Sequence, residues 1–574
     1  MEEKKSILDL FKEKNHGISR RLFLQSCGAA LAVASMPVNL TKVFAADAFS
    51  RQPAHTTLTW TLDPRTTQTL AWTTSVAADK GTLQYIDTQA YKKTGWQNAL
   101  SVQADTEEFD ANTDYVRLHY ATAQKLKPGT AYTYRVGYGS EWSDPQSFST
   151  EADNLSKFKF LIFGDSQSGI PANPEYKPWQ KTIESAYAAN TDAAFFMNIG
   201  DLVEIGQDYA HWKNWYAAAA NVLEKIPGMA VTGNHETYDV PKEDHSVLPV
   251  YFKKQISLPL NGPEELKGQV YSFDYGNVHF AVLDSQENEE GSYIENMLKK
   301  EADWLDKDLA SSKQTWKLVF FHKTPYYNKA ERSNENVKKA FAPVIDKHHV
   351  DVVINGHDHG YSRTYPIYND EFVGSPDKGT VYLVTGRSGN KYYTDLSQKV
   401  WDAFFHDPQA EPNYVVVTVN GPKLVISAYT QSGSCIDVYT IDKVAKTDSP
   451  RTILPGKANY TRLAIWGNLL QTPLIPVPPQ QIENVWYLPL SSFIDFIGGD
   501  MDIKDNTLAL IYKKDKITLK TDSNAAILNN NTLSLTHPVK LVKDTPMIAA
   551  DDLKSLLKFD NRYDPSLNIL FLVK

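Results

Sequence analysis

The chain has 574 residues, of which 42% are hydrophobic and 22% are charged. This composition excludes a collagen-like, coiled-coil or wholly disordered protein, and the length predicts several domains. The net charge of −9 argues against a nucleic-acid-binding surface, and we expect none. Because the only cysteines are Cys27 and Cys435, we expect no disulfide framework, and any metal must be bound by His, carboxylate or amide groups.

Residues 1–46 are predicted to be an export signal. Arg20 and Arg21 precede an apolar run, Cys27–Met36, and a small-residue cleavage pattern ends at Ala45. This order resembles a bacterial twin-arginine signal, so we expect an extracellular or cell-surface protein. Cleavage there removes seven basic and four acidic residues and leaves a net charge of −12. Since no later apolar run reaches the roughly 18 residues of a membrane span, we expect no transmembrane helix in the mature form.

Residues 52–152 carry short stretches of alternating polar and apolar residues separated by turn residues. Examples are Thr57–Trp60 and Tyr132–Val136. This period of two predicts a half-buried antiparallel β-sandwich of about 100 residues.

Residues 155–445 alternate apolar β-runs with helical stretches such as Pro178–Ala189 and Tyr293–Leu309. Continuous apolar strands are buried on both faces, so the pattern predicts a layered α/β domain. Asn420-Gly421 lies between two further runs and predicts a β-hairpin. The predicted buried strands are Phe158–Phe163, Ala193–Ile199, Met229–Thr232, Val278–Leu283, Leu318–Phe321, Val350–Ile354 and Val381–Thr385.

The remaining sequence is predicted to be a linker, 446–462, and a small α+β domain, 463–574, that repeats internally. Residues 487–493 align with residues 547–553, an offset of 60, and later apolar residues continue in the same register. Each unit is predicted to be a short helix followed by a strand.

Five polar clusters follow five of the predicted strands. The carboxyl ends of strands in an open α/β sheet are where ligands bind, and a glycine before four of the clusters permits a sharp turn. Distant segments can therefore converge at one edge. The clusters are Gly164–Gln167, Gly200–Glu204, Gly233–Glu236, His322–Pro325 and Asn355–His359.

The residue types in these clusters predict a metal centre. Asp, Asn and His side chains together suit Zn, Fe or Mn. His357 and His359 share a face if their segment is extended, or bind two adjacent ions if it is a loop. One carboxylate can bridge two ions, and two ions roughly 3.5–4 Å apart can stabilise the attacking and leaving oxygens of a phosphoryl displacement.

The order of the clusters resembles the five motif blocks of the calcineurin-like metallophosphoesterases, and most closely the purple acid phosphatases. Residues 356–363 are similar to the final histidine block of that family, residues 322–327 to its isolated-histidine block, and residues 126–134 to the end of its fibronectin-III-like domain. The resemblance covers residues 52–445. It implies a β-sandwich followed by a four-layer α/β sandwich, with two packed mixed sheets flanked by helices.

The resemblance also implies the roles of individual residues and two divalent or trivalent ions. Asp165, Asp201 and His359 are expected to bind one ion, with Asp201 bridging to the other. The second ion is expected to be completed by Asn234, His322 and His357, and His235 to contact the phosphate and help protonate the leaving oxygen. The nucleophile implied is a metal-bound hydroxide, so no phospho-enzyme is needed.

Two positions depart from the family pattern, and two more are candidate contacts. Glu204 stands where purple enzymes have a tyrosine ligand, so we expect a colourless protein in which Glu204 either binds metal or faces solvent. Gln167 stands where many relatives have His, and it either binds metal weakly or hydrogen-bonds a water or phosphate oxygen. Tyr361 and Arg363 are candidate metal or substrate contacts because they follow the histidine pair.

The function predicted is a secreted phosphatase that hydrolyses phosphomonoesters. A phosphodiesterase or a nucleotide or pyrophosphate hydrolase is the alternative on the same metal core, and a non-catalytic cell-surface binding protein is the alternative of another class. A serine nucleophile is disfavoured because no G-x-S-x-G motif occurs. The segment 463–574 resembles the copper-amine-oxidase amino-terminal-like stalk domain, which implies a spacer or an attachment to the cell wall or surface.

Overall fold

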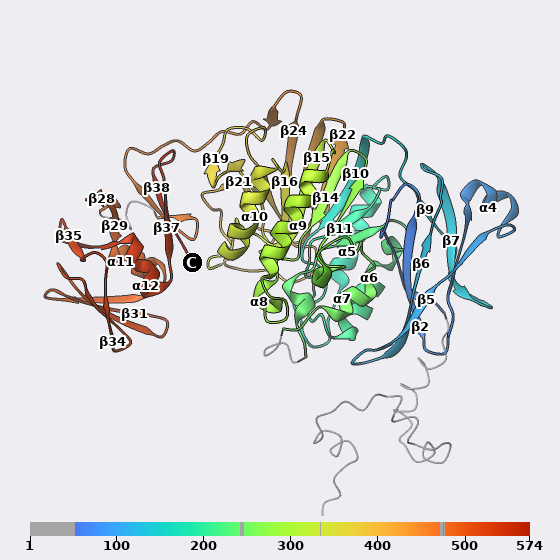
Figure 1. Ribbon diagram of the computed structural model, residues 1–574, viewed down its shortest axis with the longest axis horizontal. Helices are drawn as coiled ribbons and strands as arrows, with labels where there is room; N and C mark the ends of the chain where they lie inside the picture. Colours follow the sequence, from blue (N-terminus) through green and yellow to red (C-terminus); the bar gives the residue numbers. More distant parts are fainter. Residues whose placement is uncertain (1–51, 241–245, 333, 471–474, 476) are drawn as a thin grey trace, which may run out of the picture.

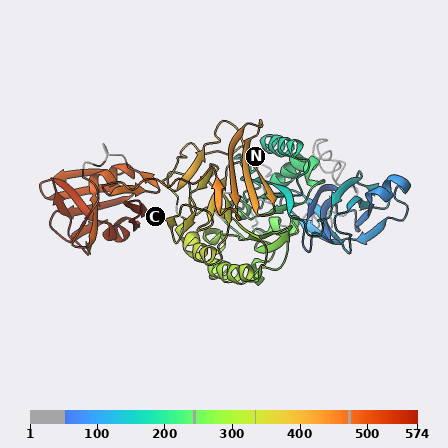
Figure 2. The same ribbon diagram turned by 90° about the horizontal axis from the view of Figure 1, so that it is seen from above.

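The computed structural model describes residues 52–240, 246–332, 334–470, 475 and 477–574. The predicted export signal lies outside these described residues. The described chain forms three units in a row, with the α/β unit in the middle (Figures 1 and 2). None of the described helices is long and apolar enough to cross a membrane.

The first unit is the predicted β-sandwich. Its sheets have the strand orders β1-β2-β6-β5 and β4-β3-β7-β8, and β9 also pairs with β7. Trp60 packs on Phe195 and Tyr275 of the middle unit, so the two units share apolar contacts. The elements are β1 (Ala54–Thr59), β2 (Gln68–Ser75), β3 (Thr82–Asp87), α4 (Thr88–Thr94), β4 (Leu100–Gln103), β5 (Asp105–Asp110), β6 (Tyr115–Ala123), β7 (Ala131–Tyr138), β8 (Glu141–Trp142) and β9 (Gln146–Ser149).

The middle unit contains two mixed seven-stranded sheets. The first has the order β12-β11-β10-β22-β23-β24-β25, in which β10 is parallel to β11 and antiparallel to β22. Its hairpin β22–β23 turns at Asn420 and Gly421, as predicted. The strands are β10 (Lys157–Phe163), β11 (Phe196–Asn198), β12 (Gly228–Ala230), β22 (Asn413–Asn420), β23 (Lys423–Thr430), β24 (Cys435–Asp442) and β25 (Thr447–Ser449).

The second sheet has the order β13-β14-β15-β16-β20-β17-β21, with β14, β15, β16 and β20 parallel. A separate two-stranded hairpin, β18–β19, lies between β17 and β20 in the chain. The strands are β13 (Tyr271–Tyr275), β14 (Val278–Val282), β15 (Trp316–Lys323), β16 (Val352–Gly356), β17 (Tyr361–Thr364), β18 (Ile367–Tyr368), β19 (Glu371–Phe372), β20 (Val381–Thr385) and β21 (Asp402–His406).

Helices cover the outer faces of the two sheets. In Figure 2, α9 and α10 (yellow-green) lie along one side, and α5 and α6 (teal), which pack on each other, lie on the opposite side. The helices are α5 (Lys177–Ala189), α6 (Tyr209–Leu223), η2 (Asn234–Thr237), α7 (Val250–Gln255), η3 (Glu264–Leu266), α8 (Glu287–Glu290), α9 (Met297–Ser311) and α10 (Glu335–Lys347). The predicted four-layer α/β sandwich is confirmed.

Strand β15 shows why the apolar runs are continuous. Leu318 and Phe320 belong to the core between the two sheets, whereas Val319 and Phe321 belong to the core beneath α9 and α10. Since successive side chains alternate between faces, a strand buried on both faces must be apolar at every position. The apolar run ends at His322, where the sheet reaches its carboxyl edge.

Among its described residues, the third unit contains three small sheets, two short α-helices and one 3₁₀ turn. Each of its repeats is a strand, a helix and then a further strand pair, so the predicted helix is preceded by a strand that the pattern did not predict. Strands β29 and β36 occupy equivalent positions and pair antiparallel. The elements are β26 (Arg462–Ile465), β27 (Asn468–Leu469), β28 (Gln480–Ile482), β29 (Val485–Pro489), α11 (Leu490–Phe496), β30 (Asp500–Lys504), β31 (Thr507–Tyr512), β32 (Asp515–Lys520), β33 (Ala525–Leu528), β34 (Asn531–Ser534), β35 (Lys540–Val542), β36 (Thr545–Ala549), η5 (Ala550–Asp552), α12 (Leu553–Leu557), β37 (Asp560–Asp564) and β38 (Ile569–Val573).

The third unit packs directly on the middle unit. The Val400 N–H donates to the Gly467 carbonyl at 2.8 Å, and a Cβ at Gly467 would lie 2.4 Å from the Trp401 ring. Arg562 pairs with Asp370 at 2.9 Å across the same boundary. A spacer needs no such contact, so the structure adds a docking surface that the sequence did not predict.

Candidate metal centre

The predicted site residues meet at the carboxyl edge of the sheets, and several of them have strained backbones. The φ angles are 45° at Asp165, 51° at Asp201, 74° at His357 and 58° at His359. Positive φ is uncommon for residues with a Cβ and persists where the surrounding structure enforces it, often at functional sites. In three of the clusters the residue that follows the glycine, Asp165, Asp201 or His357, has the left-handed conformation. We had expected the glycine itself to make the turn.

The glycines of these clusters are needed mainly for close approach. A Cβ at Gly233 would lie 2.2 Å from the backbone nitrogen of Asp201, and a Cβ at Gly356 would lie 2.9 Å from Oδ2 of Asp165. Only Gly200 combines a positive φ, 82°, with such crowding. Glycine thus lets neighbouring loops touch, which brings the polar side chains within reach of one another.

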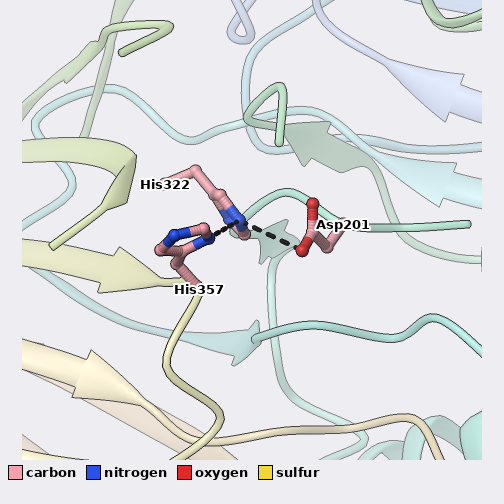
Figure 3. A group of neighbouring side chains, drawn as sticks. All are labelled: Asp201, His322 and His357. Atoms are coloured by element: carbon pink, nitrogen blue, oxygen red, sulfur yellow. Dashed lines mark hydrogen bonds and ion pairs between the residues drawn. The ribbon is translucent and has the colours of Figure 1, made fainter. Parts of the chain in front are cut away.

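Two groups of buried side chains share Asp201. In one group Asp165, Asp201 and His359 offer ligand atoms that all lie within 4.8 Å of one another. In the other, Asp201 Oδ2 lies 3.2 Å from His322 Nε2, which lies 3.2 Å from His357 Nδ1 (Figure 3). The two groups bring together Asp165, Asp201, His322, His357 and His359 of the expected ligands, and Asn234 lies in the wall of the adjacent cavity.

The histidines are oriented by backbone carbonyls. Nδ1 of His322 donates to Ile199 O at 2.7 Å, and Nδ1 of His359 donates to Lys391 O at 2.8 Å. A carbonyl only accepts, so Nδ1 of each ring has a proton, and Nε2 is the nitrogen that can bind a metal when it has no proton. His359 Nε2 is buried and has no hydrogen-bond partner among the described residues, and the same is true of Asn234 Oδ1. These orphaned atoms beside two carboxylates fit the implied metal ions.

Burial and neighbouring charges shift the pKa values of the site residues. Burial raises the pKa of Asp165 well above its usual range, with a further contribution from Asp201. Burial acts in the same direction on Asp201, but His322 and His235 outweigh it and hold the pKa of Asp201 well below its usual range. Burial lowers the pKa of His357 and His359 well below 6.5, so both imidazoles are neutral. Burial also lowers the pKa of His322, but Asp201 and Asp165 outweigh it and raise this pKa to about 9. An ionised bridging carboxylate and neutral imidazoles are the states in which these groups bind metal, so a metal must displace a proton from His322.

Glu236, which the sequence did not single out for a role, holds the loops of the site together. Its buried carboxylate accepts hydrogen bonds from the backbone N–H of Gly233 at 2.7 Å, of Asp201 at 2.8 Å and of Leu202 at 2.8 Å, and more weakly from Val203 at 3.3 Å. The loops after β11 and β12 are thereby joined through one side chain. A glutamate three residues after the glycine, in a turn with many free N–H groups, was the available signal.

His235 lies next to the two groups. Its Nδ1 donates to Glu204 O at 2.7 Å, so the proton is on Nδ1. Its Nε2 lies 3.9 Å from Asp201 Oδ2 and 2.7 Å from Lys391 Nζ. Lys391 was not predicted, because it lies in a loop that follows no motif block.

Gln167 and Glu204, the two residues that depart from the family pattern, are both buried beside the metal centre. The Gln167 amide donates to Asp201 Oδ2 at 3.1 Å, and its Oε1 has no hydrogen-bond partner among the described residues. Glu204 is 1% exposed and accepts from the Gly169 N–H at 3.1 Å, so it does not face solvent, and it is in neither of the two groups.

Tyr361 and Arg363 are placed away from the predicted contacts. They follow each other at a spacing of two along β17 and therefore share one face, and both bind Asp437 of β24, at 3.1 Å and 3.0 Å. The pleat directs both side chains into the interface between the sheets, so neither is among the residues of the two ligand groups.

A cavity of about 450 Å³ opens beside the two groups. Its wall combines site residues with cations, carboxylates and two tyrosines, and it is large enough for a small organic ligand. The residues are Asn234, His235, Tyr238, Asn288, Glu289, Lys323, Glu331, Arg332, Asn334, His357, Lys391 and Tyr393.

Three families match successive parts of the chain. Residues 53–150 match the purple acid phosphatase N-terminal domain, residues 158–361 the calcineurin-like phosphoesterases, and residues 470–571 the copper amine oxidase N-terminal domain.

Individual relatives agree with these matches. Purple acid phosphatase 21 of Arabidopsis thaliana is 29% identical over 286 residues, which are 48% of this chain and 59% of that protein. Probable inactive purple acid phosphatase 1 of the same plant is 26% identical over 368 residues, 57% of this chain and 58% of that protein. The chain thus spans less than two thirds of these relatives. A purple acid phosphatase from yellow lupin (Lupinus luteus) seeds shares the fold, with 21% identity, a TM-score of 0.55, and coverage of 68% of this chain and 74% of that one.

Proposed function

Because its middle unit is a calcineurin-like phosphoesterase domain that follows a purple acid phosphatase N-terminal domain, we propose that this protein is a metal-dependent phosphatase acting on phosphomonoesters. The observation that carries the proposal is the pair of buried ligand groups that share Asp201 at the edge of the cavity. Two cations bound there would supply Lewis-acid chemistry, polarising a phosphoryl group and lowering the pKa of water.

The residues of the chain have separate tasks in this proposal. Asp165, Asp201 and His359 hold one cation, and Asn234, His322 and His357 with Asp201 hold the other. His235 contacts the phosphoryl group and, in its doubly protonated form, protonates the leaving oxygen through Nε2, because Nδ1 is engaged by a carbonyl. The backbone carbonyls that accept from Nδ1 of His322 and His359 keep Nε2 of both rings directed at the ligand groups.

The first test is hydrolysis of p-nitrophenyl phosphate by the full chain loaded with Fe, Zn or Mn. We expect about two ions per chain. Asp201→Asn and His357→Ala should lower kcat by at least about 1,000-fold while leaving the circular dichroism spectrum intact. Asp192→Asn is the matched control, because that carboxylate side chain is 71% exposed and pairs only at the surface. Full activity of Asp201→Asn would refute the assignment.

The same preparation separates the alternatives. Faster hydrolysis of bis(p-nitrophenyl) phosphate, or of pyrophosphate, would favour a diesterase or a nucleotide or pyrophosphate hydrolase. A protein that binds two ions but hydrolyses none of the esters would favour a binding role, and the probable inactive relative makes this outcome important to test.

We also propose that the protein is exported and that its third unit serves attachment at the cell surface. The support is the twin-arginine pattern around Arg20 and Arg21 and the copper amine oxidase N-terminal match. Fractionation of cells that express the chain with Arg20→Lys and Arg21→Lys should show loss of export. Activity that stays outside the cell in this double variant would contradict the proposal.

A further inference from the structure

Lys391 lies in the loop between β20 and β21, and its backbone is fixed against the metal centre. Its carbonyl accepts from His359 Nδ1 at 2.8 Å, and its Cβ lies close to Gly169, where an added Cβ would be 3.1 Å away. The neighbouring Asn390 N–H donates to Gln167 O at 3.1 Å. The loop is thus bound to both the histidine block and the first motif block, so the lysine is held in place where it enters the cavity wall.

The side chain of Lys391 places a positive charge beside the proposed acid. Nζ lies 2.7 Å from His235 Nε2 and 3.6 Å from Glu204 Oε1, and the side chain is 19% exposed. When His235 is neutral, with its proton on Nδ1, Nε2 accepts from the ammonium group. Nε2 of His235 is the atom that must face the phosphoryl group. The ammonium group of Lys391 therefore lies beside the position expected for that group.

The other cations of the cavity are bound differently. Lys323 Nζ contacts Glu289 at 2.6 Å, and Arg332 Nε contacts Asp358 at 2.8 Å. Their charges are compensated at short range by Glu289 and by the fully buried Asp358. The shortest contact of Lys391, at 2.7 Å, is with an imidazole nitrogen, and its carboxylate partner Glu204 is farther away, at 3.6 Å.

We propose that Lys391 contacts the phosphoryl group of the substrate and makes the site favour phosphomonoesters over phosphodiesters, and that Glu204 positions it. The inference rests on the proposed phosphatase function. A monoester has close to two negative charges near neutral pH and a diester has one. A third cation in a partly desolvated wall therefore stabilises the monoester more than the diester. Glu204, where purple enzymes have a tyrosine, acts through Lys391 and His235.

The test compares p-nitrophenyl phosphate with bis(p-nitrophenyl) phosphate on the metal-loaded full chain. In Lys391→Met, kcat/KM for the monoester should fall about 10–100-fold and that for the diester no more than about 3-fold, since one charge-assisted hydrogen bond is lost. Lys391→Arg should keep the monoester preference, and Glu204→Gln should shift the ratio in the same direction as Lys391→Met by a smaller factor. Lys299→Met, a 72% exposed lysine on α9, is the control.

Equal losses on both esters, or no loss, would overturn the inference, because a purely structural ion pair with Glu204 does not distinguish the substrates. Calorimetry with orthophosphate gives a readout that does not depend on turnover. Binding should weaken by about tenfold in Lys391→Met. A wild-type protein that hydrolyses neither ester would defeat the proposed function, whereas unchanged phosphate affinity in Lys391→Met would defeat the role of Lys391 alone.

Discussion

Replacing Glu236 by Gln tests whether one buried carboxylate holds the site together. The carboxylate has two oxygens for four backbone N–H groups, at 2.7, 2.8, 2.8 and 3.3 Å. A glutamine has one carbonyl oxygen, and its NH₂ group faces the N–H groups that the other oxygen bound. About two buried donors therefore lose their acceptor, each at a cost of about 1–3 kcal/mol.

We expect Glu236→Gln to lower the free energy of unfolding of the middle unit by about 2–6 kcal/mol. The melting temperature should fall by about 4–24 °C, at about 2–4 °C for each kcal/mol in a unit of this size. The loops with Asp201 and Asn234 should also shift, and a displacement of about 1 Å can reduce the rate about 100-fold. Differential scanning calorimetry and the p-nitrophenyl phosphate assay measure the two effects.

Glu151→Gln is the matched control for this substitution. Glu151 is also buried, but a single backbone N–H, that of Gly276 at 2.7 Å, donates to it in the described structure, and an amide oxygen can accept that bond. We expect a loss below about 1 kcal/mol and normal activity. If Glu236→Gln has the same melting temperature as Glu151→Gln and hydrolyses p-nitrophenyl phosphate at the wild-type rate, the Glu236 carboxylate does not organise the site and the reasoning is wrong.

Three further predictions concern the domain contact, the pH dependence and the colour. Gly467→Ala should release the third unit to limited proteolysis, because an added Cβ meets an indole at 2.4 Å, whereas Gly498→Ala, at a matching φ of 75° with nothing within 4 Å, should not. Burial alone lowers the pKa of His279, but hydrogen bonds to two carboxylates at 2.7 Å raise it to about 9. His279 therefore contributes at most about 3 kcal/mol to the free energy of unfolding, and this contribution is present below pH 6.5 and lost as the pH rises through 9. Urea unfolding of His279→Gln at a series of pH values should lack this loss of stability. The iron-loaded protein should show no strong visible tyrosinate band, and such a band would contradict the prediction.

The sequence by itself determined the layers of the middle unit and the residues that meet at its edge. Apolar runs such as Phe158–Phe163 specify strands buried on both faces, and the polar clusters follow those strands directly. Because parallel strands end at one edge of a sheet, short motifs far apart in the chain converge without any further information. This is why Asp165, Asp201 and His357 could be placed from the sequence.

Tertiary structure decided the contacts that come from outside the motifs. Lys391 reaches the site through a loop whose path depends on packing, and no local pattern marks it. Arg363 lies four residues from a site histidine, yet the pleat of β17 and the second sheet direct it to Asp437. The docking of the third unit at Gly467 depends on the shapes of two surfaces. Local patterns encode which face of an element is buried, but they do not encode which surface will cover it.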